Sequence, residues 1–123
     1  MSHVHSALVV EDDTWMREAM VEALTAGGHQ ARGARDGAEA LRRLAEDGPF
    51  CLVFLDLAMP GTDGRAFMDH LRRSPDPGWP PVVIVSAYCT RDEARSLGAT
   101  DLLKKPFTFD RLPGLMAQHC GTQ

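Results

Sequence analysis

Short apolar runs alternate with longer stretches of mixed apolar and polar residues along the chain. The apolar runs predict strands at Ala7–Val10, Phe50–Leu55 and Val82–Val85, with shorter or weaker candidates at Leu102–Leu103 and Gln30–Ala34. The run Phe50–Leu55 shows no polar alternation, which is typical of a strand buried on both faces in the middle of a parallel sheet.

The stretches between these runs have helical spacing. After Thr14, the residues Met16, Met20 and Leu24 recur every fourth position, as one buried helix face requires, and Gly27 ends the pattern. Further helices are predicted at Ala38–Glu46, Arg65–Arg73, Arg91–Leu97 and Phe107–His119.

The two C-terminal helices are expected to be atypical. Arg91–Leu97 leaves room only for a short or irregular fourth helix before Gly98. In the fifth helix, Thr108 is the predicted N-cap, which places Pro113 just past the first turn. A proline there removes one hydrogen bond and crowds the preceding turn, so we expect this helix to be weakened.

Five alternations of strand and helix predict βαβ crossovers and a parallel α/β sheet that is covered by helices on both faces. A length of 123 residues is typical of one domain. We expect this domain at residues 7–120, after a disordered N-terminus at residues 1–6.

Composition and charge narrow the class of protein. The chain is 44% hydrophobic and 24% charged, as globular proteins are. Its net charge of −4 argues against nucleic acid as the main partner of the domain. No apolar run approaches the ~20 residues of a membrane span, and no basic segment followed by an apolar stretch marks a secretory signal.

The cysteines and the N-terminal histidines give little sign of a metal or disulfide site. Cys51, Cys89 and Cys120 are odd in number and widely spaced, which predicts free thiols in a reducing cytoplasm. His3 and His5 alternate as metal ligands on a strand would, but they lie in the terminus that is expected to be disordered.

Polar side chains follow four of the predicted strands. The first strand ends in Glu11, Asp12 and Asp13, and the others end at Asp56, Ser86 and Lys105. Ligands of open parallel sheets bind beyond the carboxyl ends of the strands, so we expect these side chains to meet. Taken singly, the three acids are typical of a solvated loop, and Asp56 and Ser86 of helix caps.

Crowded carboxylates repel one another unless a cation neutralises them, and oxygen ligands suit Mg²⁺ or Mn²⁺. Asp12 and Asp56 are the candidate direct ligands, with Glu11 through water and one backbone carbonyl from the loop after Asp56. Asp56 is then a candidate nucleophile for a phosphoryl group, forming an acyl phosphate. Lys105 adds a positive charge, and Ser86 can donate a hydrogen bond to a phosphoryl oxygen.

Over about Ala7 to Gln118 the chain resembles the receiver domain of two-component response regulators, of the chemotaxis-regulator type. The resemblance is carried by four motifs, Leu-Val-Val-Glu11-Asp12-Asp13, Phe-Leu-Asp56-Leu-Ala-Met-Pro60-Gly61-Thr-Asp-Gly64, Val-Ile-Val-Ser86-Ala87 and Lys105-Pro106-Phe107. It implies a flavodoxin-like (βα)5 three-layer sandwich with strand order 2-1-3-4-5.

The resemblance also implies a role for each site residue. The phosphorylated aspartate corresponds to Asp56, the acid pair to Glu11 and Asp12, the carbonyl metal ligand to Ala58, the switch hydroxyl to Ser86 and the lysine to Lys105. The Lys105-Pro106 bond is expected to be cis. The implied partners are a histidine kinase or phosphotransfer protein, and a downstream protein or a fused effector domain absent from this chain. A monomer or weak homodimer is expected.

Two positions depart from the family pattern. Leu102 stands where the family usually has the aromatic residue that moves with the switch hydroxyl. Tyr88, the single tyrosine, either covers the site or serves as the moving aromatic, unless it is simply a half-exposed loop residue. The alternative to a switch is a pseudo-receiver that binds partners without phosphorylation. A phosphatase of the haloacid dehalogenase type needs a second aspartate where Ala58 stands, so we expect no enzyme beyond the domain's own phosphoryl transfer and dephosphorylation.

Overall fold

The computed structural model describes residues 5–57, 64–74 and 79–120 of the chain. Its strands are β1 (Ser6–Val10), β2 (Gln30–Ala34), β3 (Leu52–Asp56), β4 (Val82–Ser86) and β5 (Asp101–Lys104). They alternate with the helices α1 (Thr14–Ala26), α2 (Gly37–Glu46), α3 (Gly64–Arg73), α4 (Arg91–Ser96) and α5 (Arg111–His119).

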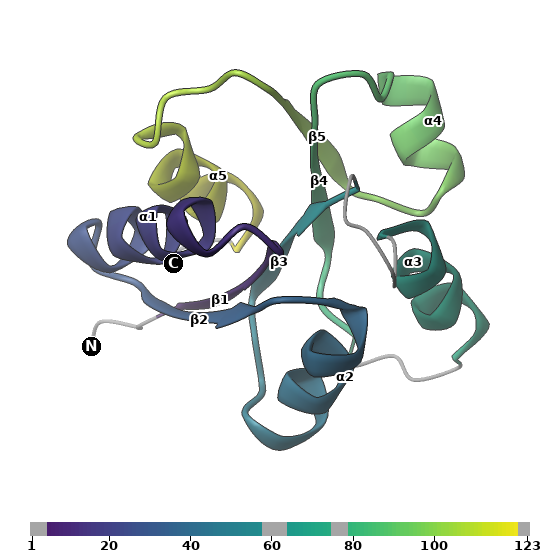
Figure 1. Ribbon diagram of the computed structural model, residues 1–123, viewed down its shortest axis with the longest axis horizontal. Helices are drawn as coiled ribbons and strands as arrows, with labels where there is room; N and C mark the ends of the chain where they lie inside the picture. Colours follow the sequence, from purple (N-terminus) through teal and green to yellow (C-terminus); the bar gives the residue numbers. More distant parts are fainter. Residues whose placement is uncertain (1–4, 58–63, 75–78, 121–123) are drawn as a thin grey trace.

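The five strands form one parallel sheet in the order β2-β1-β3-β4-β5, as the family resemblance implied. Helices α1 and α5 cover one face, and α2, α3 and α4 cover the other (Figure 1). Along β1, Ala7 and Val9 face the α1 and α5 side while Leu8 and Val10 face the opposite side. The three-layer α/β sandwich is therefore confirmed.

The weak apolar signal at Gln30–Ala34 has a simple cause. This strand is β2, which lies at the edge of the sheet and pairs only with β1. Its burial alternates from exposed to partly buried residues until Ala34, which is fully buried. The central strands β3 and β4 are buried at every position, so their sequences are continuously apolar up to the final polar residue.

Polar side chains fix where the helices begin. Asp13 accepts a hydrogen bond from the backbone N–H of Met16 at 2.8 Å and caps α1. Thr90 and Glu93 form a reciprocal capping box at the start of α4. The fourth helix is short, as predicted, but regular.

The prediction for the fifth helix was wrong at its start. The helix begins at Arg111 rather than at Phe107, and its N-cap is Asp110 rather than Thr108. Pro113 is therefore the third helical residue, where a backbone N–H would have no partner within the helix. It costs α5 no hydrogen bond and instead packs on the end of α1, where a Cβ atom at Gly27 would lie 2.8 Å from the Pro113 Cγ.

The expected disordered segment also reached too far. Ser6 is the first residue of β1, and the His5 ring lies 3.3 Å (Nδ1 to Sγ) from Cys51. Residues 1–4, with His3, lie outside the described part of the chain.

Candidate functional site

Strand register brings the predicted site residues to one edge of the sheet. Parallel pairing aligns the ends of β1, β3, β4 and β5, so Glu11, Asp56, Ser86 and Lys105 follow or end neighbouring strands. Within the described ranges, the buried polar residues are Glu11, Asp56 and Ser86. The sequence predicts all three as site residues. Two of them are carboxylates, and burial of a carboxylate requires a positively charged or hydrogen-bonding partner.

A lysine lies against the buried acids. The Lys105 Nζ is 3.2 Å from the Asp56 Oδ2 and 4.0 Å from the Glu11 Oε1. The peptide bond between Lys105 and Pro106 is cis, as the resemblance implied. The lysine thus supplies one positive charge beside two buried carboxylates.

One lysine does not balance the cluster. Burial and, to a smaller extent, the neighbouring Asp56 and Asp12 together raise the pKa of Glu11 to about 8, although a hydrogen bond from the Asp13 N–H acts in the opposite direction. The Glu11 Oε1 is buried and accepts no hydrogen bond from any described residue. The site therefore favours a second positive charge, either a proton or a cation.

The donor set fits Mg²⁺ or Mn²⁺. One carboxylate oxygen from each of Glu11, Asp12 and Asp56 lies within 4.8 Å of the other two. All three donors are hard oxygens, and the buried Oε1 of Glu11 is a polar atom that such a cation would satisfy. The expected fourth donor, the carbonyl of Ala58, lies outside the described residues.

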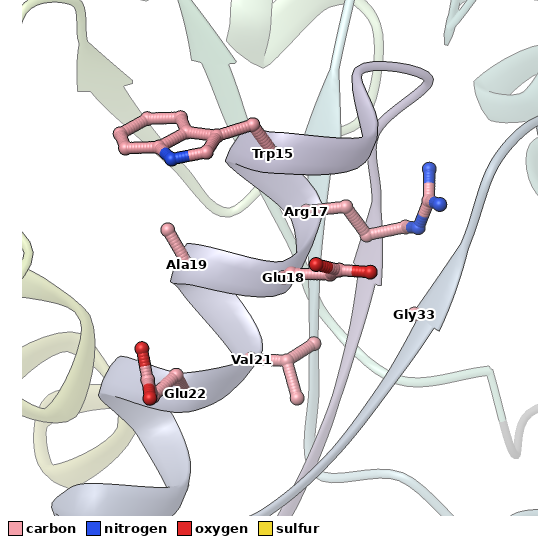
Figure 2. Close-up of a pocket in the computed structure, with 7 residues that line it drawn as sticks. All are labelled: Trp15, Arg17, Glu18, Ala19, Val21, Glu22 and Gly33. Carbon is pink, nitrogen blue, oxygen red and sulfur yellow. The ribbon is translucent and has the colours of Figure 1, made fainter.

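Arg17 on α1 anchors the backbone of Glu11 and Asp12. The sequence did not predict this role. The Arg17 Nη1 donates hydrogen bonds to the backbone carbonyls of Glu11, at 2.9 Å, and Asp12, at 3.4 Å. Figure 2 shows Arg17 reaching from α1 toward Gly33 on β2, while Trp15 projects from another side of the helix. A Cβ atom at Gly33 would lie 2.9 Å from the Arg17 Cγ and Cδ. A glycine within a strand was the one available signal for this close approach.

Ser86 organises the loop after β4. Its Oγ accepts hydrogen bonds from the backbone N–H groups of Tyr88, at 3.2 Å, and Cys89, at 3.1 Å. The alternative that Ser86 caps α4 is excluded, because Thr90 does so. A hydroxyl that accepts two bonds still carries an O–H that can donate.

The two residues that depart from the family pattern lie in opposite environments. Leu102 on β5 is buried and packs in the core on the α2, α3 and α4 side of the sheet. The Tyr88 side chain is 91% exposed and does not cover the carboxylates. Lys104, beside Lys105 in sequence, points elsewhere and donates to the carbonyls of Ala87 and Cys89 at 3.3 and 3.4 Å.

Comparisons with known proteins agree with this geometry. The model of the response regulator receiver domain family matches residues 7–117. Response regulator protein FleR of Pseudomonas aeruginosa is 40% identical over 116 residues, which are 91% of this chain and 24% of FleR. Response regulator MprA of Mycobacterium ulcerans is 37% identical over 107 residues, 85% of this chain and 45% of MprA. The chain thus spans less than half the length of these curated relatives.

Solved structures share the fold. Chemotaxis protein CheY4 of Vibrio cholerae superposes with a TM-score of 0.83 at 25% identity, over 95% of this chain and 99% of the CheY4 chain.

Within the residues that the structure describes, no helix is both long and apolar enough to cross a membrane.

Proposed function

Because the chain belongs to the receiver domain family of two-component response regulators, we propose that Asp56 accepts a phosphoryl group and so changes how the domain binds its partner. Phosphorylation-based switching is general in this family. The observation that carries the proposal is the buried Asp56 carboxylate, held 3.2 Å from Lys105 and beside Glu11 and Asp12. The donor of the phosphoryl group is a phosphohistidine of a histidine kinase or phosphotransfer protein.

The proposed reaction is a displacement at phosphorus. A carboxylate oxygen of Asp56 attacks the phosphorus, and the bond from phosphorus to the donor imidazole nitrogen breaks. The imidazole leaves with the bonding electron pair and takes up a proton, and Asp56 becomes an acyl phosphate. Water later attacks this phosphorus, the bond from phosphorus to the Asp56 oxygen breaks, and inorganic phosphate leaves while the carboxylate is restored. The domain thus acts only on its own phosphoryl group.

Each neighbouring group has a separate task. Lys105 neutralises negative charge on the phosphoryl oxygens, and the Ser86 hydroxyl donates a hydrogen bond to one of them. Glu11, Asp12 and Asp56, with the carbonyl of Ala58, would hold Mg²⁺ or Mn²⁺. Such a cation, when bound, offsets the charge that develops on the transferred oxygens.

The switch follows from the position of Ser86. If its hydroxyl turns toward a phosphoryl oxygen, the N–H groups of Tyr88 and Cys89 lose the acceptor that they share. The loop that carries the exposed Tyr88 must then rearrange. Leu102, buried in the core, has no polar group with which to report this change. We therefore assign the readout to the Tyr88 loop rather than to position 102.

A partner that reads this loop belongs to a separate protein or to a further domain of the same polypeptide. FleR and MprA are both longer than the matched region, which covers 24% of FleR and 45% of MprA. The acidic net charge of −4 fits a protein partner for this domain better than a nucleic acid. A monomer or weak homodimer is consistent with this function.

The second candidate is a pseudo-receiver that binds its partner without phosphorylation. The observation in its favour is the buried Leu102 in place of the family's aromatic residue. The two functions differ in whether Asp56 takes up a phosphoryl group at all.

Intact-protein mass spectrometry separates them. The chain is incubated with Mg²⁺ and acetyl phosphate, beside Asp56→Asn and the control Asp13→Asn, whose side chain can still cap α1. We expect one added phosphoryl group in the wild type and in the control, none in Asp56→Asn, and none after chelation of Mg²⁺. If folded wild-type protein that binds Mg²⁺ takes up no phosphoryl group, the pseudo-receiver is correct.

A further inference from the structure

A second cluster of reactive side chains lies at the opposite edge of the sheet from Asp56. His5 directly precedes β1, Cys51 directly precedes β3, and Cys120 directly follows α5. The amino ends of the parallel strands β1 and β3 meet there, whereas the carboxylates stand at the carboxyl ends. The cluster is therefore independent of the phosphoacceptor site.

The three side chains present their ligand atoms to one another. The Nδ1 of His5 is 3.3 Å from the Sγ of Cys51. One ligand atom from each of His5, Cys51 and Cys120 lies within 4.8 Å of the other two. In a tetrahedral site with Zn–S bonds of about 2.3 Å and Zn–N bonds of about 2.0 Å, two ligand atoms lie roughly 3.5 to 3.8 Å apart. The 3.3 Å between His5 and Cys51 is near the value for such a pair, and the 4.8 Å limit on the other two pairs lies about 1 Å beyond it, within reach of small side-chain movements.

Backbone hydrogen bonds hold each residue of the cluster in place. The Cys51 N–H donates to the Ser6 carbonyl at 2.7 Å, and the Cys120 N–H donates to the Met116 carbonyl at 2.8 Å. The His5 carbonyl accepts from the Gln30 N–H at 2.9 Å. Little ordering entropy remains to be lost when a ligand binds, which favours binding.

The two thiols can bind a metal ion because a divalent cation at bonding distance displaces their protons. In this partly buried cluster the cation also supplies the positive charge that two neighbouring thiolates need.

The donor atoms indicate which ion the cluster would bind. Two thiolates and one imidazole bind Zn²⁺ in preference to Mg²⁺. A second imidazole lies close by, since the ring centroids of His5 and His29 are 6.3 Å apart.

We propose that His5, Cys51 and Cys120 bind one Zn²⁺ ion, with water as the fourth ligand. Two Zn–S bonds and one Zn–N bond form, the two thiol protons go to solvent, and no oxidation or reduction takes place. The ion would link the residues that directly precede β1 and β3 to the C-terminal end of α5. It thus defines a metal site chemically distinct from the oxygen cluster around Asp56.

Cobalt substitution tests the donor set directly, because thiolate ligands give Co²⁺ a charge-transfer absorption that carboxylates do not. The reduced full-length chain is titrated with Co²⁺ beside Cys51→Ser, Cys120→Ser and His5→Ala, with Cys89→Ser as the matched thiol control. We expect the absorption to saturate at one equivalent in the wild type and in Cys89→Ser, to be lost in both other serine variants, and to be displaced by Zn²⁺.

A second measurement does not depend on whether the variants fold. In the wild-type protein, alkylation followed by peptide mass analysis reports the reactivity of each thiol with and without Zn²⁺. We expect Zn²⁺ to protect Cys51 and Cys120 and to leave Cys89 unchanged. The proposal is overturned if reduced wild-type protein shows no thiolate absorption, if Cys51→Ser retains it, or if Zn²⁺ does not protect the two reduced thiols from alkylation.

Discussion

The Lys105 ammonium lies 3.2 Å from the Asp56 carboxylate although the two residues are 49 positions apart in the chain. The pair forms because β3 and β5 flank β4 in a parallel sheet and their carboxyl ends share one edge. This one contact joins the proposed phosphoacceptor to the charge that neutralises the incoming group.

Replacing Lys105 should slow phosphorylation of Asp56. Lys105→Met removes a preorganised positive charge from a buried site, and such losses cost about a hundredfold in rate. The rate of phosphoryl uptake from acetyl phosphate, followed by intact mass at saturating Mg²⁺, measures the effect. Lys104→Met is the matched control, since Lys104 contacts loop carbonyls instead of Asp56. Equal slowing in both variants would contradict the assignment.

The raised pKa of Glu11 makes stability depend on pH. Burial, with smaller contributions from Asp56 and Asp12, lifts this pKa from 4.5 to about 8, so the folded chain keeps a proton that the unfolded chain releases between these values. The stabilisation from this group is complete below pH 4.5 and is lost as the pH rises through 8.

Mg²⁺ should therefore stabilise the fold more at pH 8.5 than at pH 6, because it takes the place of the Glu11 proton. Thermal unfolding with Mg²⁺ or EDTA at both pH values measures this, and we expect the Mg²⁺-induced rise in melting temperature to be larger by a few degrees at pH 8.5. Glu11→Gln should remove most of the difference. A larger effect of Mg²⁺ at pH 6 would show that Glu11 is not a titrating member of the site.

Arg17 should tune the affinity for Mg²⁺ without touching it. Because Arg17 orients the backbone of Glu11 and Asp12, Arg17→Ala should weaken Mg²⁺ binding by about tenfold. Gly33→Ala crowds the Arg17 stem and should act in the same direction with a smaller effect. Isothermal titration of the double variant provides the control, since Gly33→Ala should add nothing once Arg17 is absent. Additive losses would mean that the two residues act separately.

Ser86 should contribute to stability as well as to switching. Ser86→Ala leaves the N–H groups of Tyr88 and Cys89 without their shared acceptor, and we expect a loss of about 1–3 kcal/mol. Urea unfolding measures this, with Ser86→Thr as the variant that keeps the hydroxyl. A Ser86→Ala protein as stable as the wild type would show that the loop does not depend on this side chain.

The alternation of apolar runs and helical stretches was enough to predict the sheet, because central strands such as β3 have no polar residue until Asp56. The candidate phosphoacceptor site could be predicted because its polar residues stand at the carboxyl ends of the predicted strands. The start of α5 was missed for a local reason. A short turn, in which the Arg111 N–H donates to the Thr108 carbonyl at 3.0 Å, precedes the helix and shifts Pro113 into its first turn.

Contacts that depend on how helices and strands pack leave no pattern in the local sequence. Nothing in the spacing of Cys51 and Cys120 shows that β3 and α5 bring them together. His5 was not predicted to join them because it lies in the segment that was expected to be disordered. Arg17 lies on the same helix as the buried stripe of Met20 and Leu24, yet its contacts run back to the strand before it. Such relations depend on how elements pack, which local sequence does not encode.

Asp56 is proposed to carry the phosphoryl group, and this can be tested chemically. Borohydride reduces an acyl phosphate of aspartate to homoserine, so reduction of the phosphorylated chain followed by peptide mass analysis identifies the modified position. We expect homoserine at position 56 only, dependent on both Mg²⁺ and acetyl phosphate. Homoserine at Asp12 or Asp13, or at no position in protein that has gained phosphoryl mass, would contradict the assignment to Asp56.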